Sequence, residues 1–347
     1  MKVNEVIKYA KSLNQHTQLY DILKHRLIHK GYIRSDKQKE DLNDLVLSEL
    51  YLIANSSYRS FEANKLHLLF QATYYLNSGN YKSAIRYYQE LINLFNDNQH
   101  LILNPPIYYL SAIQGILDSL CIAGLYHETP FFLSKLEELT QNEYSTEFIL
   151  HLKTLIYIYK SNSLLQAGNF EQALELRDKQ ENELLKKVTS LGLESQLRLY
   201  LSFAVLGMYT KDYVQARKYM KKIFSLGKLF CAFPSYKIAR LVNLLLQAEL
   251  GNYDFFENEI ISIKRNIRFE KQTYITEKLI FKFIQGYPLP SYEKARNKRW
   301  LQYQKDIQKI EQDKYERQLL KTFDVLAWIE SKLTQRSLAD ILAEKAH

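Results

Sequence analysis

The chain has 347 residues, which is long enough for two ordinary domains or for one elongated array of repeats. Apolar residues make up 46% and charged residues 24%, values near the globular average that exclude general disorder. Only 10 glycines and 6 prolines are present, so the sequence favours an all-α protein and gives little support to a β domain.

Residues 1 to 60 contain two or three helical segments without a clear repeat signature. The first 20 residues are polar and charged, unlike a secretory signal, and no stretch approaches the ~18 uninterrupted apolar residues of a membrane span. We therefore expect a cytoplasmic protein without membrane contact. The segment is predicted to be an N-terminal helical cap or a degenerate repeat, with Lys30-Gly31-Tyr32 as the remnant of a turn.

A short turn motif recurs between residues 61 and 290. Its first positions are spaced 45, 44, 43 and 40 residues apart, at Gly79, Gly124, Gly168, Lys211 and Gly251. An aromatic residue follows two positions later in every case, and a small residue three positions after that in three cases. These residues are Tyr81, Tyr126, Phe170, Tyr213 and Tyr253, and Ala84, Ala173 and Ala216. Near-constant spacing between helical patterns indicates a repeat.

The residue types of the turn suit a helix pair. Glycine can end the first helix in the left-handed conformation, and the Asn or Asp beside it can accept a hydrogen bond from the first N–H groups of the second helix. The aromatic residue is expected to pack at the corner between the two helices. The alanine would let the helices approach closely, and stacked pairs would cover each other's apolar faces.

The stretch SGNYKSAIRYY, residues 78–88, resembles the middle of a tetratricopeptide repeat. Gly79, Tyr81, Ala84 and Tyr88 occupy its glycine, aromatic, alanine and aromatic positions. The period is longer than the 34 residues of the consensus and the closing proline is absent. The chain is therefore more similar to divergent long-period arrays, such as the sensor domains of bacterial peptide-responsive regulators. The resemblance implies a right-handed α-solenoid of about five units over residues 61–290, with helical caps at 1–60 and 291–347.

The C-terminal region begins after a break at Gly286, Pro288 and Pro290. Long charged helices follow, and they carry an apolar stripe that is expected to cover the last repeat. The stripe consists of Leu319, Phe323, Leu326, Ile329 and Leu333.

The resemblance also implies a concave groove lined by the first helix of each pair. Polar side chains in such a groove could pair with the backbone of an extended peptide. The turn register places these residues there: Thr73, Asn77, Gln114, Asp118, Asn162, Gln166 and Arg198. We therefore expect a non-catalytic platform that binds a peptide or a protein segment.

Positive charge offers an alternative function. The formal net charge is +9, and residues 211–282 contain 14 Lys or Arg against 7 Asp or Glu. Such a region could attract nucleic acid or another acidic surface. The candidate patch is Lys218, Lys221, Lys222, Lys264, Arg265 and Arg268. Two further alternatives are a peptide-gated regulator with residues 1–60 as its effector part, and an accessory subunit that serves assembly alone.

Sequence motifs give no support to catalysis. No glycine-rich phosphate loop or nucleophile elbow is present, so we expect neither enzymatic activity nor a cofactor. Asp21, His25 and His29 could share one helical face, but the glutamate of a zinc-protease motif is missing and we expect no metal site. Cys121 and Cys231 lie in apolar surroundings and are interpreted as buried free thiols.

Overall fold

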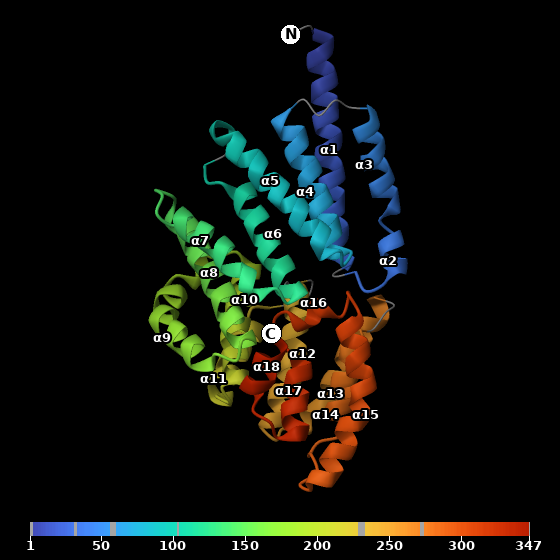
Figure 1. Cartoon of the computed structure of the whole chain (residues 1–347), viewed down its shortest axis with the longest axis vertical. Coiled ribbons are helices and arrows are strands. Elements are labelled where there is room, and N and C mark those ends of the chain that lie inside the picture. Colours follow the sequence, from blue (N-terminus) through green and yellow to red (C-terminus); the bar gives the residue numbers. More distant parts are fainter. Residues whose placement is uncertain are drawn as a thin grey trace. The chain divides into compact units, whose positions relative to one another are not determined.

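The computed structural model describes residues 3–30, 33–55, 60–102, 104–227, 233–270 and 274–346 (Figure 1). These residues form helices, turns and loops, with no strand among them, which confirms the all-α class. The chain divides into two compact units, Met1–Ala123 and Gly124–His347. The boundaries expected at residues 60 and 290 stay predictions.

The first unit is built from consecutive packed helices. Helix α4 packs on α5 and α5 on α6, while α1 packs on α3 and α4. In Figure 1 the N-terminal end of α1 extends beyond the neighbouring helices. The elements are α1 (Val3–Lys30), α2 (Asp36–Glu40), α3 (Asn43–Asn55), α4 (Phe61–Asn77), α5 (Tyr81–Asp97), η1 (Gln99–Leu101) and α6 (Ile107–Ala123).

A buried carboxylate joins α3 to α4. Glu49 is only 1% exposed. Its carboxylate accepts a hydrogen bond of 2.6 Å from Gln71 Nε2 and contacts His67 Nδ1. Because a buried polar group needs hydrogen-bond partners, these contacts hold α3 against α4.

The second unit continues the pairwise packing. The helices α8, α10, α12 and α14 pack against one another in succession, and α9, α11 and α13 each pack on the preceding helix. The elements are η2 (Tyr126–Glu128), α7 (Thr129–Leu139), α8 (Thr146–Gln166), α9 (Phe170–Lys186), η3 (Val188–Ser190), α10 (Leu193–Tyr209), α11 (Tyr213–Ser225), α12 (Pro234–Glu249), α13 (Phe255–Glu270), α14 (Ile275–Ile284), α15 (Glu293–Gln312), α16 (Arg317–Leu320), α17 (Val325–Thr334) and α18 (Leu338–Ala346).

All five turn positions lie in the left-handed region. Four are glycines with φ between 73° and 78°, and the fifth is Lys211 with φ 61°. Asn80 and Asp212 accept hydrogen bonds from the backbone N–H groups of Ser83 (3.2 Å) and Gln215 (3.1 Å), as helix N-caps do. Asn169 makes no such side-chain bond at the start of α9.

Two turn aromatics differ from the expected corner packing. Tyr253 is 43% exposed, because α13 begins only at Phe255 and Phe256 takes the buried place. The two rings meet edge to face at 5.7 Å. Tyr126 is half-buried in the short helix η2, and α7 starts at Thr129. In both turns the second helix starts later than the register predicted.

The helices of a pair approach closely at glycine and alanine. Ala84, Ala173 and Ala216 are completely buried. Opposite Ala216 lies Gly207 of α10, where an added Cβ would come within 2.8 Å of the Asp212 carbonyl oxygen and 2.9 Å of the Ala216 nitrogen. The backbones of α10 and α11 are therefore nearly in contact, and there is no room for a larger side chain.

The C-terminal helices contact elements that lie before the predicted last repeat. The predicted apolar stripe is buried throughout, but its contacts include earlier helices. Phe323 packs on Tyr209 of α10 at 5.0 Å, and Trp328 on Phe283 of α14 at 5.6 Å. At Gly168, after α8, an added Cβ would lie 2.4 Å from the Ala339 carbonyl oxygen. The sequence shows an apolar stripe, but it does not specify which helices the stripe covers.

Candidate functional site

In the first unit, the four predicted groove residues are half-buried on α4 and α6. Asn77 Nδ2 donates a 2.8 Å hydrogen bond to the Thr73 carbonyl oxygen of its own helix. The Thr73 hydroxyl also interacts with the phenol of Tyr20 from α1. Burial raises the pKa of Tyr20 to about 12. Thr73 therefore takes part in the packing of α1 on α4. Gln114 and Asp118 also have polar interactions within the structure.

In the second unit, the remaining predicted residues lie where α8 faces α10. Arg198 Nη2 donates to Tyr159 Oη over 3.1 Å, and Gln166 Nε2 to Tyr209 Oη over 3.5 Å. Further toward the start of the two helices, Ser195 Oγ lies 3.3 Å from His151 Nδ1. We call these groups the polar row; it consists of His151, Tyr159, Asn162 and Gln166 of α8 with Ser195, Arg198 and Tyr209 of α10.

One end of the polar row binds the backbone of the chain itself. Asn162 Nδ2 donates a 3.0 Å hydrogen bond to the Lys321 carbonyl oxygen. Tyr209 Oη accepts a 2.8 Å bond from the Asp324 backbone N–H. Residues 321–324 form the irregular link between α16 and α17. Thus side chains of α8 and α10 already satisfy both a backbone acceptor and a backbone donor of a non-helical segment.

The other end of the polar row carries a histidine with a perturbed pKa. Burial lowers the pKa of His151 below its ordinary 6.5, and the nearby Arg198 guanidinium lowers it further. His151 is therefore neutral at pH 7, and Arg198 supplies the positive charge at this end.

The surroundings of His151 predict a low midpoint for the titration of its ring. In an NMR titration of the histidine ring protons, the His151 signal, assigned with a His151→Gln variant, should have a midpoint below 6.5. Because the unfolded chain binds this proton more readily, the free energy of unfolding should fall as the pH drops below 6.5 toward the folded-state pKa. Arg198→Ala should raise the midpoint. A midpoint at or above 6.5 in the wild type would show that the ring is solvated.

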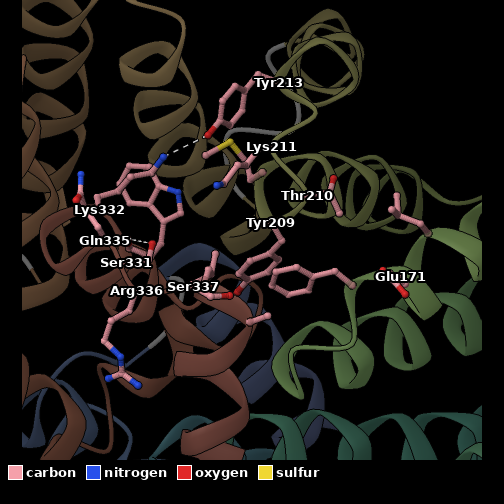
Figure 2. A pocket seen from close by; sticks show the side chains of 16 residues that line it. Glu171, Tyr209, Thr210, Lys211, Tyr213, Ser331, Lys332, Gln335, Arg336 and Ser337 are labelled. Carbon is pink, nitrogen blue, oxygen red and sulfur yellow. Dashed lines mark hydrogen bonds between the residues drawn. The ribbon is translucent and has the colours of Figure 1, made fainter.

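A cavity of about 660 Å³ opens beside the turns that begin α9 and α11. The first residues of these helices, the end of α10, and α17 with α18 form its walls (Figure 2). Its apolar lining includes Phe170, Leu174, Met208, Trp328 and Leu338. The sequence pattern predicts only a packing role for Phe170 and Tyr213, so this site does not follow from it. The cavity arises because α17 and α18 lie across the turns.

A half-buried ion pair between Lys332 and Glu249 lies at one wall of the cavity. Glu249 Oε2 accepts hydrogen bonds of 2.6 Å from both Lys332 Nζ and Tyr213 Oη, while Tyr287 Oη donates to Oε1 over 3.1 Å. Figure 2 shows the contact between Lys332 and Tyr213. Burial and the Glu249 carboxylate raise the pKa of the Tyr213 phenol far above its usual value. The charge of Lys332 is thus compensated within the structure.

The basic residues of the alternative interface are distributed over α11 and α13, and both helices pack on α12. Lys218, Lys221, Lys264 and Arg265 are exposed. Lys222 is half-buried, with its ammonium 5.4 Å from the centres of two tyrosine rings. The side chain of the last predicted member, Arg268, lies outside the described residues.

Neither a metal site nor a membrane span is found in the described part of the chain. Among the described residues, no group of three or more His, Cys, Asp or Glu side chains could hold a metal ion. The side chain of His29 is not among the described residues. Cys121 is a buried free thiol, and Cys231 is not among the described residues. No helix in these ranges is long and apolar enough to cross a bilayer.

Comparisons of the chain with protein-family models, with curated protein sequences and with solved structures returned no match.

Proposed function

We propose that the chain is a non-catalytic binding platform for an extended protein segment. Its architecture would be a right-handed α-solenoid of divergent tetratricopeptide-like helix pairs, in which the first helices carry the groove. The polar row is the part of the groove that we assign to the partner. The proposal is supported by the packing of α8, α10 and α12 in succession and by the recurring turns.

The observation that carries the proposal is the pairing of the polar row with residues 321–324. Asn162 binds a backbone carbonyl and Tyr209 binds a backbone N–H. Both contacts are independent of the side chains of the bound segment, and this is the chemistry by which a groove holds an extended peptide. A partner segment would bind beside this internal segment, at the end marked by His151, Ser195 and Arg198.

Arg198 determines which ligands we expect this end of the polar row to prefer. The guanidinium is half-buried, and its position over the Tyr159 ring, 5.6 Å from the centroid, fixes its orientation. A planar cation held in this way suits carbonyl or carboxylate acceptors of a peptide. The platform is therefore expected to favour extended segments that contain an acidic side chain.

The test uses selected peptides and two matched variants. A displayed library of random peptides is panned against the full chain, and the enriched peptides are measured by fluorescence anisotropy. Arg198→Ala should weaken their binding about tenfold or more, since a hydrogen bond to a charged group contributes roughly 1.5–3 kcal/mol. Arg217→Ala removes an exposed arginine of α11 and should leave binding unchanged.

Two outcomes would contradict the proposal. One is the absence of any enriched peptide. The other is equal affinity for the wild type and Arg198→Ala. If the basic residues of α11 and α13 were the true site, binding of an acidic ligand would instead fall by orders of magnitude as salt is raised from about 50 to 200 mM.

A further inference from the structure

Lys211 is an unusual residue at its position in the repeat. The four equivalent turn positions hold glycine, whereas Lys211 adopts φ 61° with a full side chain. The left-handed conformation brings Cβ close to a backbone carbonyl and is unfavourable for residues other than glycine. A lysine held in this conformation suggests that its ammonium has a role that offsets the strain.

The side chain of Lys211 lines the cavity beside α17 and α18. Among the described residues, no group forms an ion pair or hydrogen bond with its ammonium. The other basic residues of the lining are compensated: Lys332 is bound to Glu249, and Arg336 pairs with Glu330 at 3.3 Å and with Glu344. Figure 2 shows Arg336 directed away from Lys211 and Tyr213. Among the described residues of the lining, Lys211 is therefore the basic residue whose charge is available to a ligand.

Much of the remaining cavity lining is apolar. The Phe170 and Tyr209 rings stack at 5.6 Å, and the buried Trp328 forms another part of the lining. The lining also contains the acidic residue Glu171. In Figure 2, Tyr209 lies between Glu171 and Lys332. A volume of about 660 Å³ falls in the usual range for small-molecule sites, which combine apolar walls with a few polar groups.

We propose that this cavity binds a small organic anion. A single acidic group, a carboxylate or sulfonate, would be held by the Lys211 ammonium, and an aromatic or aliphatic body would lie against Phe170 and Trp328. The cavity shares Tyr209 with the polar row. Its ligand would contact Lys211, Phe170 and Trp328 instead of His151 and Arg198, so this proposal does not depend on the function proposed for the polar row.

The test compares a charged and an uncharged probe of similar shape. The probes are 1-anilinonaphthalene-8-sulfonate and N-phenyl-1-naphthylamine, whose fluorescence rises on transfer to an apolar site. Lys211→Gly should weaken binding of the sulfonate about tenfold and leave binding of the neutral amine unchanged. Lys211→Arg should restore most of the lost affinity. Lys221→Ala removes one exposed lysine outside the cavity and should bind both probes as the wild type does.

Loss of folding cannot explain the expected result, because glycine is the residue that the turn conformation prefers. The melting temperature of Lys211→Gly should equal or exceed that of the wild type. The inference is wrong if Lys211→Gly binds the sulfonate as tightly as the wild type. It is also wrong if Lys221→Ala weakens the sulfonate by the same factor, or if the neutral amine loses affinity in parallel.

Discussion

Replacing Trp328 by alanine is expected to lower the free energy of unfolding of the second unit by about 3–5 kcal/mol, the usual cost of removing a buried tryptophan. The ring is 1% exposed. It packs on Phe283 of α14 at 5.6 Å and on Phe323 at 6.4 Å, and the Lys332 ammonium lies 5.2 Å from a ring centroid. The side chain therefore connects α17 to α14 and to the link before α17.

Urea unfolding measures this effect. Both tryptophans of the chain, Trp300 and Trp328, belong to the second unit, so Trp300 fluorescence still reports on that unit in the variant. Leu301→Ala is the control, because Leu301 is 63% exposed on α15 and should change stability by at most about 0.5 kcal/mol. A loss below about 1 kcal/mol for Trp328→Ala would mean that α17 is not part of the core.

Gly207→Val is expected to destabilise the second unit by about 3 kcal/mol or more, at the upper end of the cost of overpacking. The atoms that oppose an added Cβ are mostly backbone: the Asp212 carbonyl oxygen at 2.8 Å and the Ala216 nitrogen at 2.9 Å. A flexible side chain could move aside, but these atoms belong to the turn and to α11. The two helices would have to separate, and their apolar contact would be lost.

Gly192→Ala is the matched control for this variant. Nothing lies within 4 Å of the Cβ that it would add, and the residue precedes α10 with an ordinary negative φ of −58°. Because Gly192 is the N-cap of α10, where alanine is less favourable than glycine, this variant should lose at most about 1 kcal/mol of stability. Equal stability of Gly207→Val and Gly192→Ala in urea would show that α10 and α11 are not in close contact at Gly207.

Local patterns predicted the helix pairs well. The turn glycines and the small residues Ala84, Ala173 and Ala216 follow from short-range rules, because helix ends and close crossings depend on single residue types. The exact start of a second helix does not follow from such rules. The late start of α13 moved Tyr253 to the surface and left Phe256 to pack in its place.

Long-range contacts explain what the sequence did not show. The turn register predicts Asn162 as a groove residue, but its hydrogen-bond partner, Lys321, lies 159 positions further along the chain. The cavity likewise requires α17 and α18 to lie across turns more than 100 residues earlier, and no periodicity encodes that arrangement. One available signal was Lys211, the only one of the five aligned first positions that is not glycine.

The most direct test of the proposed function is photo-crosslinking with a selected peptide that carries a benzophenone group, followed by mass spectrometry of the linked residues. Binding at the polar row predicts crosslinks within α8 and α10, residues 146–166 and 193–209, that disappear in Arg198→Ala. Crosslinks confined to α11 and α13, residues 213–225 and 255–270, would contradict the groove assignment and favour the basic surface instead.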